Sequence, residues 1–208
     1  MQNFMKILPM TDGMLNAVAN LHMQAFEGAL NTRLGKFYIN KVLGWFIKVE
    51  NGIALVAKFG PSEEIVGYVI GAPLGYAKEL NRDLFWVAFV NILIRPWLFC
   101  NKHFRVVVKC RLRSFMHISQ GHISEVALPM PIISLVGIAV MPSQQGKNIG
   151  KELLLAFERH ATEKQAGSLR LSVYPENLSA RHIYEKCGWL PIENQNGHGE
   201  TMNYYKIL

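Results

Sequence analysis

The sequence predicts one mixed α/β domain over residues 1–208, and three patterns support that class. A continuous apolar run from Leu135 to Val140 has the composition of a buried strand. A turn rich in glycine and amide side chains follows it, and then an amphipathic helix begins. Residues from Ser168 to Tyr174 alternate between polar and apolar, as in a strand with one buried face. Strands interleaved with helices in this way are typical of α/β proteins.

The N-terminal part of the chain continues the alternation of strands and helices. Asp12 is placed to cap a helix whose apolar side chains, from Met14 to Ala25, follow helical spacing. A second helix is expected from Leu34 to Trp45. Strands are expected at Lys6 to Pro9, Ile53 to Phe59 and Ile65 to Ala72, with a hairpin turn at Gly60-Pro61-Ser62 between the last two.

The C-terminal part predicts two helices and two strands. Ile149, Leu153 and Phe157 recur at fourfold spacing, so a helix is expected after the glycine-bearing turn, and Gly167 ends it. After the alternating strand, Asn177 or Ser179 can cap a short helix that ends at Gly188. Thr201 to Leu208 then has the pattern of a last strand.

Composition limits the class of function. Half of the 208 residues are hydrophobic, and the net charge is +7. Binding of nucleic acid or a basic character without a function would explain this charge, but we favour the interpretation that much of it serves to bind anionic small molecules. The three cysteines, Cys100, Cys110 and Cys187, have no metal-ligand spacing, so we expect no metal and a reducing, cytoplasmic location. The first ten residues contain too short an apolar run for a secretory signal.

Residues 84–116 form an unusual segment that is apolar in its first half and basic in its second. The apolar part falls short of the ~20 residues that a spanning helix needs. Three interpretations remain open: a helical insert with a basic outer face, a surface that contacts anionic lipid or a membrane enzyme, or a nucleic-acid contact. The basic residues of the second half are Lys102, Arg105, Lys109, Arg111 and Arg113, and no acidic residue occurs between Asp83 and Glu125.

The stretch from Leu135 to Gly150, L-V-G-I-A-V-M-P-S-Q-Q-G-K-N-I-G, predicts an anion site. A strand that delivers a glycine-bearing loop to a helix N-terminus brings free N–H groups and the positive end of the helix dipole together. The ligand expected there carries phosphate.

A second segment, Asn177 to Trp189 (N-L-S-A-R-H-I-Y-E-K-C-G-W), follows about thirty residues after the first. Together the two segments resemble the GNAT superfamily of acyl-CoA-dependent N-acyltransferases. Residues 145–150 occupy the family's loop pattern, except that Asn148 replaces its central glycine. Asparagine tolerates a positive φ better than other non-glycine residues. The resemblance implies a central, mostly antiparallel twisted sheet that splays at a bulge and is flanked by helices.

The resemblance also implies acetyl-CoA as co-substrate and a set of residues that bind it. The pyrophosphate would lie on the loop, with Lys147 and Lys151 adding charge, and the pantetheine arm on the main chain of the preceding strand, where Gly137 eases the bulge. Asn177 would contact the pantetheine, cap its helix, or do both. The residues implied are Ile138, Ala139, Val140, Gln145, Gly146, Lys147, Asn148, Ile149, Gly150, Lys151, Asn177 and Tyr184.

For the chemistry, Tyr184 matches the tyrosine that the family places near the CoA sulfur as general acid. A phenol has an ordinary pKa near 10, close to that of an alkyl thiol. The plain alternative is an aromatic core residue. Ser134 lies where many family members carry a glutamate base, so Glu125 is the replacement base proposed here. His122, Glu27, His22, a water chain, or an amine that arrives deprotonated are the alternatives.

Residues 21–35 bear on the identity of the amine acceptor. Their sequence, L-H-M-Q-A-F-E-G-A-L-N-T-R-L-G, looks like the N-terminal region of a bacterial GNAT subgroup associated with surface-polysaccharide synthesis. This second resemblance implies an amino sugar, free or linked to a nucleotide diphosphate, with Glu27 and Arg33 as candidate substrate contacts. Packing for His22 and a solvated surface position for Arg33 are the plain alternatives.

Two functions are therefore expected to compete. The first is an N-acetyltransferase that transfers acetyl directly to an amine in a ternary complex, because no cysteine lies where an acyl-enzyme would need one. The second is a catalytically inactive GNAT-like module that binds acyl-CoA or regulates, as Ser134 and Asn148 would suggest.

Overall fold

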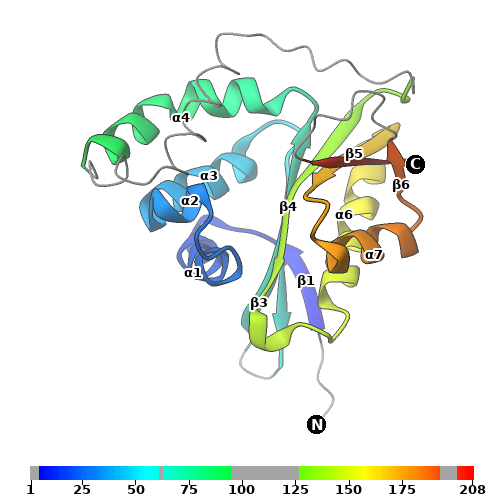
Figure 1. The fold of residues 1–208 in the computed structure, drawn as a ribbon, viewed down its shortest axis with the longest axis horizontal. Coiled ribbons are helices and arrows are strands. Elements are labelled where there is room, and N and C mark those ends of the chain that lie inside the picture. The colour runs from blue at the N-terminus through cyan, green and yellow to red at the C-terminus, as the bar shows by residue number, and fades with distance from the viewer. Residues whose placement is uncertain (1–4, 61–62, 95–126, 193–200) are drawn as a thin grey trace.

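The computed structural model describes residues 5–60, 63–94, 127–192 and 201–208, and its centre is one seven-stranded sheet (Figure 1). The strand order is β1-β2-β3-β4-β5-β7-β6. Neighbouring strands are antiparallel except β4 and β5, which are parallel. The strands are β1 (Met5–Pro9), β2 (Ile53–Phe59), β3 (Glu64–Pro73), β4 (Ile132–Val140), β5 (Ser168–Val173), β6 (Leu190–Ile192) and β7 (Met202–Ile207).

Helices cover both faces of this sheet (Figure 1). One face carries α1 (Leu15–Ala25), α2 (Leu30–Arg33), α3 (Lys36–Lys48) and α4 (Tyr76–Leu93). The other carries α6 (Ile149–Glu163) and α7 (Leu178–Lys186). Two short 3₁₀ helices, η1 (Asp12–Met14) and η3 (Pro142–Gln144), precede α1 and the loop before α6.

Each face has its own hydrophobic core, as the helical periodicities require. Leu153 and Phe157 of α6 are fully buried with Val69 of β3 on the face that carries α6 and α7. Val18 of α1 and Leu43 of α3 are buried on the face that carries α1 to α4, in the same cluster as the β3 residue Tyr68. The mixed α/β class and the flanked sheet are thus confirmed.

The sheet splays at a bulge in β4, as the resemblance implied. Ile70 of β3 lies opposite Gly137, whereas the next residue, Gly71, lies opposite Leu135, so Val136 is an extra residue in β4. β4 pairs with β5 only over Ile132–Leu135. Beyond that point the two strands separate, and the β5-facing edge of β4 has no strand partner among the described residues.

Several element boundaries differ from the expected ones. The helix expected from Leu34 to Trp45 corresponds to α3, which begins two residues later and ends three residues later. Gly35, with φ = +89°, separates it from the short helix α2, which was not expected. The last strand begins and ends one residue inside Thr201 to Leu208. β6, which has three residues, was not expected, because a strand this short shows no alternation and forms by pairing with β7.

The segment 84–116 is described only in part. Residues 84–93 are the second half of α4, a helix that begins earlier, at Tyr76. Residues 95–116 lie outside the described part, as do Pro61 and Ser62 of the expected hairpin turn, so the helical insert stays a prediction. No helix in the described part of the chain combines the length and apolarity needed to cross a membrane.

Candidate active site

The loop between β4 and α6 adopts the backbone conformations that an anion-binding turn requires. Gly146 has φ = +80° and Asn148 has φ = +60°, so asparagine keeps the left-handed conformation expected at its position. No described hydrogen-bond acceptor is recorded for the backbone N–H groups of residues 146–151. These N–H groups and the positive end of the α6 dipole therefore remain available to a ligand.

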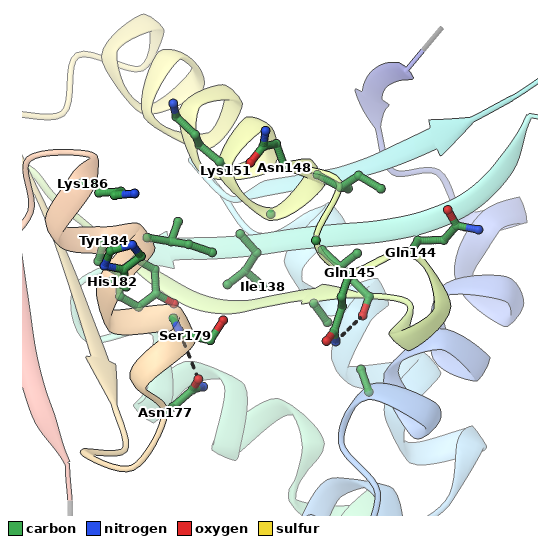
Figure 2. A pocket seen from close by; sticks show the side chains of 18 of the residues that line it. Ile138, Gln144, Gln145, Asn148, Lys151, Asn177, Ser179, His182, Tyr184 and Lys186 are labelled. Atoms are coloured by element: carbon green, nitrogen blue, oxygen red, sulfur yellow. Dashed lines mark hydrogen bonds between the residues drawn. The ribbon is translucent and has the colours of Figure 1, made fainter. Parts of the chain in front are cut away.

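A cleft of about 450 Å³ runs from this loop along β4 to α7. Figure 2 shows its walls: β4 forms the floor, the start of α6 and its loop form one side, and α7 forms the other. The cleft opens where β4 and β5 separate. Its lining residues are Ala25, Phe26, Ile138, Ala139, Val140, Gln144, Gln145, Gly146, Asn148, Ile149, Gly150, Lys151, Asn177, Ser179, Ala180, His182, Ile183, Tyr184 and Lys186.

The structure gathers the predicted cofactor-binding residues around this cleft, with the exception of Lys147. Lys147 Nζ donates a 2.7 Å hydrogen bond to Gln144 Oε1 and lies 5.4 Å from the centroid of the Phe59 ring. Gln145 also turns back on the strand, because its Nε2 donates to the Val140 carbonyl at 3.3 Å. Whether the gathered residues bind acetyl-CoA stays a prediction.

Other lining residues were missed in the sequence. On α7, Ser179, His182, Ile183 and Lys186 face the cleft, and their spacing of three and four residues is that of one helix face. That spacing could have identified them. Ala25 and Phe26, at the end of α1, carry no such signal because the tertiary fold alone brings them to β4.

Tyr184 lies in the cleft wall with most of its ring packed in the core. It is 5% exposed, and its ring centroid lies 6.1 Å from those of Trp189 and Tyr204. Burial raises the pKa of Tyr184 to about 12. Among the described residues, none forms a hydrogen bond with the Tyr184 hydroxyl. This hydroxyl is not fully buried either, because the only fully buried side-chain polar atom without a partner in the described part of the chain is Asn40 Oδ1. The Tyr184 hydroxyl therefore reaches the solvent of the cleft.

Asn177 caps its helix and lies on the cleft, while its contact with the pantetheine stays a prediction. Its Oδ1 accepts a 3.2 Å hydrogen bond from the backbone N–H of Ala180, so it caps α7. Its side chain also lies on the cleft (Figure 2). The amide nitrogen of the same side chain remains available for a ligand carbonyl.

The cleft is basic in the part between α6 and α7. Lys151 and Lys186 line it from the two helices, together with the imidazole of His182 (Figure 2). The described lining contains no carboxylate. This distribution suits a ligand with several negative charges. No group of three or more potential metal ligands occurs in the described ranges.

The candidates for the base and the acceptor contacts are described only in part. Glu125 and His122 lie outside the described residues. Glu27 is exposed in the turn after α1, and Arg33 Nε donates to the Gly28 carbonyl at 2.9 Å and so closes that turn. Neither of the two lines the cleft. Their substrate contacts stay predictions.

Two further side chains bear on the mechanism. Ser134 is buried in β4 and does not line the cleft. Cys187 is half-buried after α7 and also lies off the lining, and burial raises the pKa of its thiol. The described part of the cleft thus contains no thiol nucleophile.

Comparison with known proteins agrees with this geometry. Residues 110–189 match the acetyltransferase (GNAT) family. Among solved structures, PaiA N-acetyltransferase of Thermoplasma acidophilum in complex with coenzyme A is 12% identical, with 99% of each chain covered and a TM-score of 0.60. Aminoglycoside N-acetyltransferase AAC(6')-Iy in complex with CoA is 14% identical, with 96% of each chain covered and a TM-score of 0.62.

A third structure, spermidine/spermine N-acetyltransferase SpeG of Vibrio cholerae, is 14% identical, with 98% of this chain and 95% of that chain covered and a TM-score of 0.52. At these identities the likeness establishes the fold. No curated protein matches the sequence.

Proposed function

Since the chain carries an acetyltransferase domain of the GNAT family, we propose that it transfers the acetyl group of acetyl-CoA to a primary amine of a small molecule. One observation carries the proposal: a single cleft joins the free N–H groups of the loop before α6 to the hydroxyl of Tyr184. The N–H groups can bind the phosphates of a CoA thioester, and the Tyr184 hydroxyl can donate a proton to its sulfur.

The cofactor would lie along β4. Its pyrophosphate would accept hydrogen bonds from the N–H groups of residues 146–151, with Lys151 and Lys186 nearby. Its pantetheine arm would pair with the main chain of residues 138–140, on the edge that β5 leaves open after Leu135. The pantetheine would take the place of a neighbouring strand and bond only to main-chain N–H and C=O groups. The side chains of residues 138–140 therefore need no polar atoms.

The reaction needs one proton donor and one proton acceptor. The amine nitrogen attacks the thioester carbonyl carbon, the new C–N bond forms, and the C–S bond breaks. The departing thiolate takes the phenolic proton of Tyr184, which burial keeps in its protonated form. The proton lost by the nitrogen leaves to water or to a base, for which Glu125 remains our candidate. Transfer is direct, in a ternary complex, since the described cleft offers no cysteine.

For the acceptor, we propose an amino sugar, free or linked to a nucleotide diphosphate. The support is the resemblance in residues 21–35, together with the position of Ala25 and Phe26 from that segment on the cleft. The structural neighbours are named for acceptors as different as an aminoglycoside and spermidine or spermine. The fold therefore does not select the acceptor, and the residues at the α1 end of the cleft must do so.

An inactive acyl-CoA-binding or regulatory module is the alternative. Ser134 favours it, whereas Asn148 no longer does, because the loop keeps its left-handed conformation. Isothermal titration with acetyl-CoA tests both functions, and absence of binding at millimolar ligand would exclude both. A mass-spectrometric screen of amino sugars and nucleotide-linked amino sugars then separates them, because the module yields no acetylated product.

A peripheral contact with anionic lipid is a second proposal, and the outer face of α4 supports it. Trp86 is 70% exposed, and Leu93 is 62% exposed. The rings of Phe85, Trp86 and Phe89 contact one another on this face. The basic residues between 102 and 113 follow in the sequence.

A further inference from the structure

A hydrogen bond between His22 of α1 and Tyr68 of β3 lies next to the α1 end of the cleft. His22 Nδ1 and Tyr68 Oη are 2.5 Å apart. The His22 ring centroid lies 4.8 Å from that of Phe26, which lines the cleft one helical turn later. Tyr68 pairs in register with Ala139, another lining residue. Its hydroxyl is 4.0 Å from where a Cβ on Gly137 would lie, beside the β4 bulge.

The protons of this pair can be assigned from burial. Tyr68 is completely buried, which raises its pKa, so the phenol keeps its proton. Burial lowers the pKa of His22 to about 4, so the imidazole is neutral at pH 7 and carries one proton. If that proton were on Nδ1, the phenolic proton of Tyr68 would have no recorded acceptor in the described part of the chain. Tyr68 therefore donates to Nδ1, and His22 carries its proton on Nε2.

The Nε2–H group is accessible. Among the described residues, none forms a hydrogen bond with His22 Nε2. The nitrogen is also not fully buried, because the only fully buried side-chain polar atom without a partner in the described part of the chain is Asn40 Oδ1. His22 itself is partly exposed. The structure thus holds a neutral N–H donor in a fixed orientation beside Phe26, with its other nitrogen already engaged.

We propose that His22 recognises the acceptor, donating a hydrogen bond from Nε2–H to an oxygen atom of the amine substrate, and that Tyr68 is its positioning residue. The inference rests on the proposed function and narrows its substrate class. A fixed donor favours amines that carry a hydroxyl, carbonyl or carboxylate oxygen, and it offers nothing to the ammonium groups of a polyamine. It also removes His22 from the candidates for the base, since its basic nitrogen accepts from Tyr68.

The proton assignment has a direct test that needs no substrate. In protein labelled with ¹⁵N-histidine, the His22 signals are those lost in His22→Gln. At pH 7 we expect neutral imidazole with the proton on Nε2, and a mixture of both neutral tautomers in Tyr68→Phe. A proton on Nδ1, or an imidazolium at pH 7, would overturn the proposal.

The recognition step is tested with two primary amines of similar ring size, glucosamine and cyclohexylamine, in a thiol-release assay with acetyl-CoA. His22→Leu should lower the preference for glucosamine about tenfold, through KM for that amine, while acetyl-CoA binding is unchanged. His22→Gln, which again offers an acceptor to Tyr68 and an N–H donor, should recover most of this loss. Gln24→Ala, at an exposed position of α1, is the control that should leave the preference unchanged.

The outcomes separate the two proposals. If the wild type acetylates glucosamine and His22→Leu keeps its preference, the proposed function stands and the role of His22 is wrong. If kcat is lowered as much in His22→Gln as in His22→Leu, and added imidazole restores the rate, then His22 is a base and its proposed role in recognising the acceptor is wrong. If the wild type acetylates neither amine and does not bind acetyl-CoA, both proposals fail.

Discussion

Trp189 Nε1 donates a 2.7 Å hydrogen bond to Glu158 Oε1, and this bond joins the chain after α7 to the middle of α6. The other carboxylate oxygen, Oε2, accepts from Lys206 Nζ of β7 at 2.6 Å. Lys206 also donates to the carbonyl of Cys187 at 2.7 Å. This buried junction fixes the end of α7, and the ring of Tyr184 packs near the ring of Trp189. The position of the proposed acid therefore depends on contacts outside the cleft.

Removal of the Glu158 carboxylate should destabilise the fold strongly. Glu158→Ala leaves the Lys206 ammonium without its carboxylate partner in a largely buried site, and we expect a loss of about 3 kcal/mol in the free energy of unfolding. Urea denaturation measures it. Glu163→Ala removes an exposed carboxylate from the same helix and should cost at most about 0.5 kcal/mol. Equal losses in the two variants would show that the junction carries no special stability.

Stability should fall as the pH falls from 6.5 to 4 because of His22. Above pH 6.5 the imidazole is neutral in the folded and unfolded chains and contributes nothing. Below it the unfolded chain takes up a proton that the folded chain does not, because burial lowers the pKa of His22 to about 4. We expect this group to remove about 2 kcal/mol by pH 4, with allowance for its partial exposure.

Unfolding of the wild type and of His22→Gln across that pH range measures the effect. The variant should lose less stability than the wild type between pH 6.5 and pH 4. Parallel curves would mean that His22 titrates in the folded protein as it does in water.

A side chain larger than methyl at Gly150 should block acetyl-CoA. A Cβ there would lie 3.7 Å from Val140 Cγ2 and 3.9 Å from Ile183 Cδ1, so alanine fits. The further methyl groups of valine must enter the cleft between these residues. We expect Gly150→Val to weaken acetyl-CoA binding at least about tenfold with little change in the melting temperature without ligand.

The melting temperature with and without acetyl-CoA measures this, and Gly150→Ala is the matched control. A ligand-induced shift in Gly150→Val as large as in the wild type would contradict the placement of the pyrophosphate at the start of α6.

Local sequence patterns predicted much of the fold and part of the site. Strand β2 has the expected bounds because its apolar run is bordered by Gly52 and Gly60. Residues 145–150 line or border the cleft because one short segment supplies both the loop and the helix N-terminus. The start of α3 at Lys36 was missed, since its apolar spacing extends back to Leu34, which packs in the same hydrophobic cluster as Tyr38 of α3.

Contacts between distant segments could not be read from the sequence. The bond between His22 and Tyr68 joins residues 46 positions apart, and no sequence pattern pairs these two residues. The place of Phe26 on the cleft likewise depends on how α1 packs against β4. These features of the acceptor end of the cleft can be predicted only from the tertiary structure.

The exposed face of α4 should contribute to binding of anionic vesicles. Trp86→Glu places a charge at the centre of the aromatic cluster, and we expect at least a fivefold loss of co-sedimentation with vesicles rich in phosphatidylserine, which corresponds to about 1 kcal/mol. Phe37→Glu, at an exposed aromatic position of α3, is the control. Equal binding by the wild type and Trp86→Glu would exclude this face as the contact.

The central claim is tested most directly by thiol release from acetyl-CoA in the wild type and in Tyr184→Phe, with an amino sugar as acceptor. We expect turnover by the wild type and a fall in kcat of about 10² in the variant, with acetyl-CoA affinity unchanged. Tyr174→Phe, at an exposed position, should retain the wild-type rate. Because burial raises the pKa of Tyr184 to about 12, its ionisation should cause no loss of rate below about pH 11. Equal kcat in Tyr184→Phe and the wild type would contradict the assignment of the acid, and no turnover with any amine would contradict the enzyme itself.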